Sequence, residues 1–283
     1  MIWRVRGRTL DLSGRALVMG VVNVTPDSFS DGGLHLAPAA AIAHGLELAR
    51  LGSDLLDIGG ESSRPGASPV SLEEELARVL PVVQGLAGAT EAVLSVDTVK
   101  PEVADRALAA GAHLVNDISA LRDPAMAEVV NRHGAGIVLM HMKGDPATMQ
   151  DDPRYGDVAA EVAAFLEARL QAAAVLGIDG ERTAVDPGIG FGKTAQHNLE
   201  LLARLGDLGR LGRPVVLGVS RKRFLGTIAG KQALERDDAS LACASHALAH
   251  GWAHVVRTHA AGPMADAVRV HHSIRTRTMP PAE

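Results

Sequence analysis

Three stretches of the chain place reactive side chains directly after apolar runs. They cover residues 21–33, 57–67 and 185–194. In each stretch a β-type apolar run gives way to Gly, Pro, Ser and charged residues, as happens where a buried parallel strand ends in a functional loop. Similar transitions occur five more times along the chain. Eight strand ends with polar residues at the same end are typical of a barrel enzyme.

Carboxylate and amide side chains stand at several of these strand ends. Asp97 and Asp186 each close an apolar run, and burying a carboxylate is costly unless it binds something, which favours a functional role. Asn116 and Asp117 point to opposite faces, so one of them faces inward and can bind the edge of a heterocycle. Asn23 follows the first strand, where its amide oxygen can either bind Mg²⁺ or hold an Asx-turn.

Arginine and hydroxyl groups indicate two anion sites. The loop after the second strand contains Ser63, Arg64 and Pro65. Arginine takes a phosphate in a bidentate manner and hydroxyls bond the remaining oxygens, although an exposed surface turn is the alternative. After the last strand, Arg257 and His259 point to the same side because strand side chains alternate. They form a second candidate clamp for an anion.

Other strand ends offer surfaces for a flat ring. Met140 brings a soft apolar side chain, and a glycine-rich loop presents Phe191. The neighbouring His141 is either a ligand or a histidine bonded inside the barrel mouth. The strand that ends at Gly218 leads to Lys222 within three consecutive bases, which form either a solvated face or part of the site.

Together these groups predict an enzyme that binds a polar aromatic ring and an anionic leaving group. Carboxylates facing a lysine suit an amidine-bearing heterocycle, whereas arginine with Mg²⁺ suits a departing pyrophosphate. A Walker phosphate loop is excluded because Pro187 stands where glycine is needed. The chain also lacks a Ser-His-Asp set, a zinc spacing and a dinucleotide fingerprint.

The elements that must position these groups alternate between strand and helix. Strands are expected at about 16–23, 54–59, 92–97, 113–118, 136–141, 183–187, 214–219 and 254–259. Helices are expected at 38–51, 72–86, 157–176, 197–205, 238–250 and 262–275, with further starts at Pro101 and Pro124. This pattern predicts an α/β fold, a (β/α)₈ TIM barrel. An open doubly wound sheet is the alternative, but functional residues follow every strand instead of one switch point.

Length and composition fit a single barrel domain over residues 1–283. A short hairpin is expected at about 2–13, the barrel at about 16–275 and a tail at 276–283. Hydrophobic residues make up 47% of the chain and aromatic residues 2%, so the core must consist of aliphatic side chains. Two Gly-, Ser- and Pro-containing segments, 25–35 and 62–69, lack apolar periodicity and are expected to act as lids.

Charge and cysteine content exclude several other classes. The net charge of −5 disfavours nucleic acid and an anionic membrane as partners. Cys243 is the only cysteine, so no disulfide framework or cysteine metal site is expected, and we interpret it as a small buried side chain. No apolar run has the roughly 18 residues of a membrane helix, and no signal peptide is recognisable. The expected location is cytoplasmic.

An ordered set of motifs resembles the dihydropteroate synthase family over nearly the whole chain. The matching stretches are Asn-Val-Thr-Pro-Asp-Ser-Phe at 23–29, Asp-Ile-Gly-Gly-Glu-Ser-Ser-Arg-Pro-Gly at 57–66, Ser-Val-Asp-Thr at 95–98, Asn-Asp-Ile at 116–118, Asp-Pro-Gly-Ile-Gly-Phe-Gly-Lys at 186–193, Ser-Arg-Lys at 220–222 and Arg-Thr-His at 257–259. The resemblance implies condensation of 6-hydroxymethyl-7,8-dihydropterin diphosphate with 4-aminobenzoate, which gives 7,8-dihydropteroate and diphosphate for folate synthesis. It also implies a homodimer and a sulfonamide target.

The resemblance further implies a role for individual residues. The pterin is expected to contact Asp97, Asn116, Asp186 and Lys222, with Met140 and Gly218 as further substrate contacts. The diphosphate is expected near Ser63, Arg64, Arg257 and His259, with Mg²⁺ on Asn23, and the aminobenzoate near Pro65, Phe191 and Lys222. Diphosphate would leave first, so that the amine attacks a pterin cation stabilised by Asp97; Lys222 and Arg257 complete the catalytic set.

Two departures from the family pattern stand near the anion sites. Ser63 replaces a common threonine and keeps the hydroxyl, whereas Ala260 removes a carboxylate next to His259. Two alternatives remain at this point. A methyltransferase on a similar barrel would not need the two loops at 23–33 and 61–67, and a non-catalytic pterin-binding protein would not need an intact Asp97 or Lys222.

Overall fold

The structure is a computed structural model that describes residues 1–24, 36–63 and 68–279. Its central sheet has eight parallel strands in the order β8-β7-β6-β5-β4-β3-β10-β9. The strands are β3 (Leu17–Asn23), β4 (Leu55–Gly59), β5 (Val93–Asp97), β6 (Leu114–Asp117), β7 (Gly136–Met140), β8 (Thr183–Asp186), β9 (Val216–Gly218) and β10 (Val255–Thr258). A parallel bridge between Val185 and Val215 links the two ends of the sheet. The sheet is therefore a nearly closed barrel, which confirms the predicted fold.

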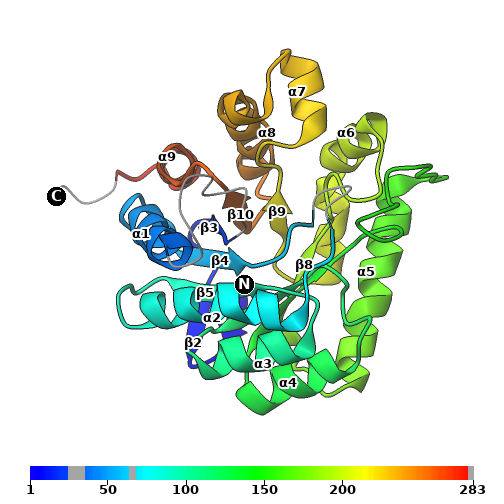
Figure 1. Ribbon diagram of the computed structural model, residues 1–283. Helices are drawn as coiled ribbons and strands as arrows, with labels where there is room; N and C mark the ends of the chain where they lie inside the picture. Colours follow the sequence, from blue (N-terminus) through cyan, green and yellow to red (C-terminus); the bar gives the residue numbers. More distant parts are fainter. Residues whose placement is uncertain (25–35, 64–67, 280–283) are drawn as a thin grey trace.

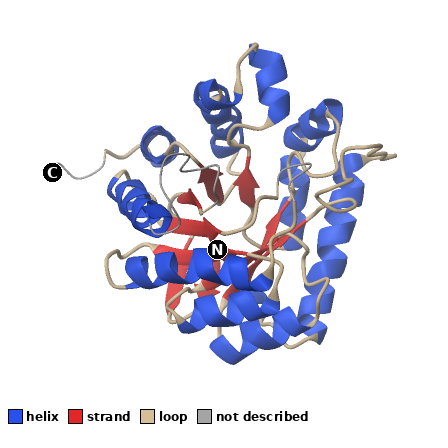
Figure 2. Cartoon of the chain, in the orientation of Figure 1, coloured by secondary structure: helices blue, strands red, loops and turns tan. Residues whose placement is uncertain are grey.

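Helices form an outer layer around the strands (Figures 1 and 2). They are α1 (Leu36–Arg50), α2 (Leu72–Ala87), α3 (Pro101–Ala109), α4 (Ala125–His133), α5 (Val158–Val175), α6 (Ala195–Ala203), α7 (Arg223–Ala229), α8 (Asp237–Ala249) and α9 (Ala261–Thr276), with short 3₁₀ turns at Gly180–Arg182, Leu205–Leu211 and Ala233–Glu235. Local sequence explains where they begin. Ser71 accepts a hydrogen bond from the Glu74 amide at the start of α2, and Pro101 occupies the first turn of α3.

The expected elements agree with the observed ones to within about two residues at most ends. Helix α7 is the exception, because its seven residues are too few to show an apolar period. Cys243, which the sequence suggested is a small buried side chain, is half-buried in the structure. In the described ranges, no helix combines the length and apolar character needed to cross a membrane.

A two-stranded hairpin closes the end of the barrel where the strands begin. It consists of β1 (Ile2–Val5) and β2 (Arg8–Asp11), which pair antiparallel around Gly7, as expected. The Trp3 indole nitrogen donates to the Arg182 carbonyl (3.2 Å), and the Arg6 amide donates to the His113 carbonyl (3.1 Å). Because the hairpin covers this end of the barrel, a binding site can open only at the other end, where the strands have their carboxyl ends.

The barrel interior changes from apolar to polar along the strand direction. Above the hairpin lies an apolar layer to which every strand contributes, with Met19, Leu55, Val93, Leu114, Val138, Ala184, Val216 and Val255. Side chains two positions further along a strand point to the same face. Those positions hold Val21, Asp57, Ser95, Asn116, Met140, Asp186, Gly218 and Arg257. The second layer therefore places carboxylates, an amide and a guanidinium on an apolar floor at the open end of the barrel.

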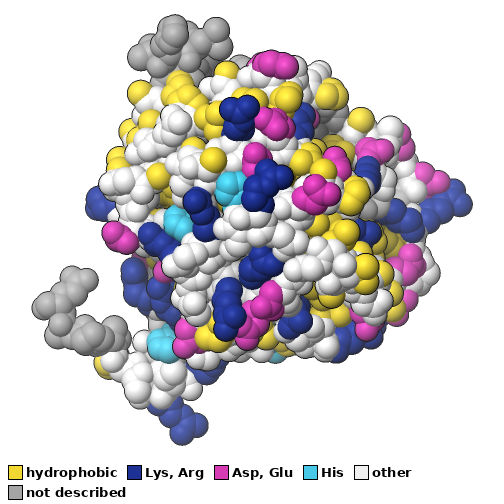
Figure 3. Space-filling model, turned by 90° about the horizontal axis from the view of Figure 1, so that it is seen from below, with side chains coloured by type: hydrophobic (Ala, Val, Ile, Leu, Met, Phe, Trp, Pro, Cys, Tyr) yellow, Lys and Arg dark blue, Asp and Glu magenta, His cyan; other side chains and the backbone are white. Residues whose placement is uncertain are grey.

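Basic and acidic side chains are interspersed over the face of the molecule shown in Figure 3. That face carries no block of one charge sign, in keeping with the net charge of −5.

Candidate active site

A buried carboxylate, Asp57, organises one side of the polar layer. It is inaccessible to solvent, and its two oxygens accept bonds from three strands. Ser95 Oγ donates to Oδ1 (2.5 Å), whereas Asn116 Nδ2 (3.0 Å) and Arg257 Nε (2.6 Å) donate to Oδ2. A buried charge is tolerated when it is paired and hydrogen-bonded in this way. Asp57 therefore sets the positions of Asn116 and Arg257.

The role of Asp57 was missed from the sequence, although a signal existed. Leu55, Asp57 and Gly59 share one face of β4 by alternation, so the aspartate had to point into the barrel. Asp57 stands within the motif at 57–66, which by itself indicates no role for it. Its partners lie up to 200 positions away along the chain, and such contacts do not show in a local pattern.

Arg257 also joins Asp57 to Asp97. Its Nη2 donates to Asp97 Oδ2 (2.9 Å), so that one guanidinium bridges two carboxylates. Burial, together with the neighbouring Asp57 carboxylate, raises the pKa of Asp97 to about 7, although Arg257 opposes the shift. Asp97 can therefore change its protonation state near neutral pH.

The opposite side of the layer carries Asp186 and Lys222. Asp186 Oδ1 accepts a bond from the Gly188 amide (2.7 Å), and burial raises the pKa of the Asp186 carboxyl. Burial lowers the pKa of Lys222 to about 8, against the effect of Asp186. Lys222 Nζ lies 4.2 Å from the centre of the Phe191 ring, a cation–π contact. A cation, a carboxylate and an aromatic face thus meet in one place.

Lys193 fixes the glycine-rich loop that carries Phe191. This lysine is 3% exposed, and its Nζ contacts His141 Nδ1 (2.9 Å), the Gly188 carbonyl (2.9 Å) and the Phe191 carbonyl (3.0 Å). Gly188 has a φ of +65°, and a Cβ there would lie 1.8 Å from the His141 carbonyl oxygen. Glycine is therefore required at this close approach. His141 is the bonded histidine of the two possibilities.

The loop after β9 links the site to helix α8. Ser220 Oγ and His259 Nδ1 are 2.9 Å apart, and the His259 amide donates to the same hydroxyl (3.1 Å). Arg221 adopts a left-handed φ of +57° and makes a bidentate pair with Asp237 at 2.7 and 2.8 Å. Of the three consecutive bases, only Lys222 lines the site.

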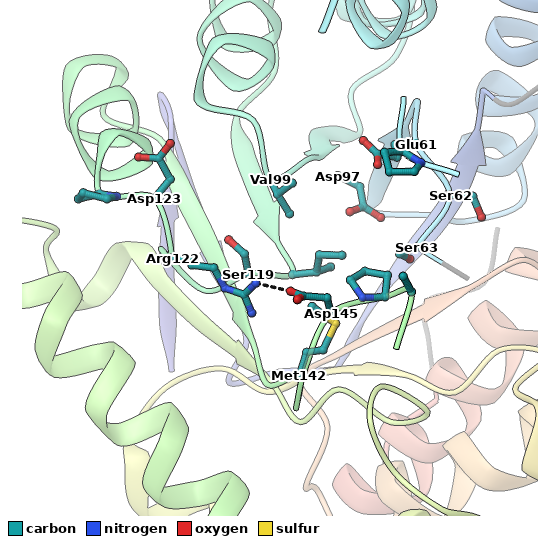
Figure 4. Close-up of a pocket in the computed structure, with 15 residues that line it drawn as sticks. Glu61, Ser62, Ser63, Asp97, Val99, Ser119, Arg122, Asp123, Met142 and Asp145 are labelled. Atoms are coloured by element: carbon teal, nitrogen blue, oxygen red, sulfur yellow. Dashed lines mark hydrogen bonds and ion pairs between the residues drawn. The ribbon is translucent and has the colours of Figure 1, made fainter. Parts of the chain in front are cut away.

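Two neighbouring cavities open at this end of the barrel. The smaller, about 40 Å³, is lined by Ser63, Asp97, Asn116, Ile118, Met140, Asp186, Ile189, Phe191, Gly218, Ser220, Lys222, Arg257 and His259. The larger, about 590 Å³, shares Ser63, Asp97 and Ile118 with it. Figure 4 shows the larger cavity, with the ion pair between Arg122 and Asp145 drawn as a dashed line.

The smaller cavity brings together the residues that the sequence singled out, with three exceptions. Arg64 and Pro65 lie outside the described residues, as do most of the two segments expected to act as lids. Asn23 lines neither cavity, but it pairs in register with Gly59 at the end of β3. Gly59 in turn pairs with Asp97. Asn23 therefore stands at the rim of the same site.

Asn23 meets the chemical requirements of a Mg²⁺ ligand. Its side chain is half-buried, and the side-chain amide makes no hydrogen bond to any residue that the structure describes. Across the described ranges, no cluster of three His, Cys, Asp or Glu side chains could hold a metal ion. Mg²⁺ commonly keeps several waters and binds few protein oxygens together with substrate phosphates. One free amide oxygen beside an anion site fits that pattern.

Comparisons with known proteins agree with this geometry. Residues 19–259 match the model of a family described as pterin binding enzymes. The dihydropteroate synthase of Escherichia coli K12 is 44% identical over 265 residues, which cover 94% of this chain and 93% of the relative. A Xanthomonas albilineans dihydropteroate synthase with bound 4-aminobenzoic acid has 48% identity and a TM-score of 0.91, covering 97% of this chain and 99% of its own.

The chain is also similar to a relative that was solved in complex with a drug. The Yersinia pestis dihydropteroate synthase, solved with a sulfonamide drug, is 41% identical with a TM-score of 0.91. The alignment covers 98% of this chain and 100% of that one. With this identity over almost the full length, the chain belongs to the dihydropteroate synthase family of pterin-binding enzymes.

Proposed function

We propose that this site condenses 6-hydroxymethyl-7,8-dihydropterin diphosphate with 4-aminobenzoate, giving 7,8-dihydropteroate and diphosphate. The observation that carries the proposal is the smaller cavity, where two carboxylates, an amide, a lysine and an aromatic ring converge. Solved relatives support both ends of the reaction. A Xanthomonas albilineans structure contains 4-aminobenzoic acid, and a Burkholderia cenocepacia structure with 43% identity contains 7,8-dihydropteroate.

The pterin ring is assigned to the polar layer. Asp186 accepts hydrogen bonds from ring N–H and amino groups, and Lys222 donates to a ring acceptor. One N–H of the Asn116 amide is bonded to Asp57, so Oδ1 and the second N–H are left for the ring. Met140 and Gly218 line the same cavity. Each hydrogen-bonding edge of the heterocycle thus has a partner.

The anionic end is assigned to Ser63, Arg64, Arg257 and His259. Breaking the bond between the pterin methylene carbon and the diphosphate oxygen leaves positive charge on the pterin and negative charge on the leaving group. Asp97 in its ionised form stabilises the first charge, and the Arg257 guanidinium stabilises the second. The aminobenzoate nitrogen then bonds to the methylene carbon and loses a proton. Phe191, Lys222 and Pro65 border the ring of this second substrate.

Mg²⁺ is assigned to Asn23 and the substrate diphosphate. When bound, the ion neutralises part of the diphosphate charge. Replacing Asn23 with alanine is expected to raise the Mg²⁺ concentration for half-maximal activity by about tenfold or more, because the one protein oxygen is lost. Asn23→Asp keeps an oxygen ligand and is the matched control. An unchanged Mg²⁺ titration in Asn23→Ala would place the ion elsewhere.

The activity of the free enzyme is expected to follow a bell-shaped pH profile. Asp97 must be ionised to stabilise the cation, so kcat/KM rises as the pH passes about 7. Lys222 must be protonated to donate to the ring, so kcat/KM falls as the pH passes about 8. Asp97→Asn is expected to remove the acidic limb. A profile that is flat from pH 6 to 9 would contradict both assignments.

The most economical test of the reaction is diphosphate release by the purified chain. Release is expected to be fastest when both substrates and Mg²⁺ are present. Release with the pterin substrate alone, at an equal rate, would indicate a hydrolase and overturn the proposal. The alternative of a non-catalytic pterin-binding protein predicts no release at all, although Asp97, Lys222 and Arg257 are intact and surround one cavity.

We also propose a homodimer and a cytoplasmic location. The exposed side chains of Val270 and Ile274 on α9, which are 56% and 69% accessible, support a contact between subunits. Light scattering at micromolar concentration is expected to give twice the mass of one chain. A monomer mass at that concentration would rule out the dimer.

A further inference from the structure

A partly buried ion cluster of Lys100, Glu61 and Glu75 lies beside the active site. Lys100 follows β5 three residues after Asp97, and its Nζ donates to the carboxylates of both Glu61 and Glu75. Glu75 belongs to α2 and is 1% exposed, whereas Glu61 lines the larger cavity. Burial lowers the pKa of Lys100, but the hydrogen bonds to the two glutamates outweigh it, so the net shift is upward. The ammonium group is therefore the charge that lets two carboxylates lie together.

Helix α2 also fixes the backbone just before Glu61. Arg78 Nη1 donates to the Gly60 carbonyl (2.7 Å). A Cβ at residue 60 would lie 2.8 Å from Val79 Cγ2 and 3.1 Å from Glu75 Cγ, so the chain passes directly over the helix. The segment that enters the active site thus starts from a defined point. Three residues after that point, Ser63 lines both cavities.

We infer that Lys100 is a positioning residue that acts on Ser63 through Glu61. Lys100 lines neither cavity, so it does not contact a substrate that occupies them. Figure 4 shows Glu61, Ser62, Ser63 and Asp97 on one side of the larger cavity. By holding Glu61 against α2, Lys100 fixes the start of the loop whose Ser63 hydroxyl is assigned to the diphosphate. The inference rests on the proposed function of this loop.

The role predicts a selective kinetic effect. In Lys100→Met, kcat/KM for the pterin diphosphate is expected to fall by about tenfold or more, because small misplacements of a positioned group are costly in rate. The affinity for a diphosphate-free 6-hydroxymethylpterin is expected to stay within about twofold, since three of the residues assigned to the ring, Asn116, Asp186 and Lys222, belong to other strands and loops. Calorimetry measures the affinity for the pterin, and steady-state kinetics with each substrate measure kcat and KM.

A double variant separates positioning from stability. Lys100→Met alone leaves Glu75 buried without its partner, which lowers the melting temperature. Adding Glu75→Gln removes that buried charge and is expected to restore most of the melting temperature, but it does not restore the anchor of Glu61. If Lys100 positions the loop, the tenfold loss persists in the double variant. If Lys100 is merely structural, activity returns together with stability, and the inference is overturned.

Two further variants complete the experiment. Lys100→Arg keeps a cation between the glutamates and is expected to retain near-normal kinetics. Lys231→Met removes a lysine from an exposed pair with Asp238 and serves as the matched control. Wild-type protein that forms no product would refute the proposed function itself. Active wild-type protein with an equally active, folded Lys100→Met variant would refute only the positioning role.

Discussion

Replacing Asp57 with alanine is expected to lower kcat/KM by about two orders of magnitude, although Asp57 lines neither cavity. The variant removes the acceptor for Arg257 Nε, Asn116 Nδ2 and Ser95 Oγ at once. Arg257 then keeps only Asp97 as a carboxylate partner among the described residues and can rotate away from the leaving group. Steady-state kinetics with both substrates measure the loss.

The same substitution is expected to destabilise the fold. Breaking a buried ion pair by removing one partner costs about 3–5 kcal/mol, because the other charge remains buried. Urea unfolding measures this cost. Ser95→Ala is the control, since it removes one hydroxyl donor to Asp57 and leaves the Arg257 pair intact, and a loss of only about 1 kcal/mol is expected. Wild-type kinetics in Asp57→Ala would show that Arg257 needs no support.

Replacing Lys222 with methionine, or Asp186 with asparagine, is expected to weaken binding of the pterin diphosphate by more than about tenfold, because a charged partner is lost from a desolvated site. Methionine also gives up the cation–π contact with Phe191. Calorimetry measures the affinity of each variant. Lys143→Met removes a lysine that is half-exposed and pairs with Glu161, and it provides the matched control.

Combining the two variants tests whether Lys222 and Asp186 act on one ligand. If both residues contact the same ligand, the double variant is expected to lose less binding free energy than the sum of the losses in the two single variants. A strictly additive loss would place them on separate ligands. An unchanged affinity in either single variant would remove that residue from the pterin site.

Much of the fold follows from local pattern. Continuous apolar runs such as 136–140 are visible in the sequence because a parallel strand is buried on both faces. Two other such runs, at 93–97 and 183–186, end in Asp97 and Asp186, and these carboxylates indicated the candidate site. Helix α7 could not be anticipated, since a helix of two turns that follows a basic stretch carries almost no periodicity.

The residues that hold the site residues in place could not be predicted from the sequence. Asp57, Lys100 and Lys193 act through partners that are 25 to 200 positions away in the chain. Asp57 and Lys193 are buried and Lys100 is partly buried by tertiary contacts, whereas an isolated Asp or Lys in a sequence is as consistent with an exposed surface residue. The groups at strand ends were predictable because topology alone brings them together.

The account is tested most directly by identifying the product of the purified chain. Mass spectrometry after incubation with 6-hydroxymethyl-7,8-dihydropterin diphosphate, 4-aminobenzoate and Mg²⁺ is expected to show 7,8-dihydropteroate. Its amount is expected to equal the diphosphate released, and Asp186→Asn is expected to form far less in the same time. Folded wild-type protein that yields diphosphate and free pterin, but no dihydropteroate, would contradict the assignment of the aminobenzoate to this site.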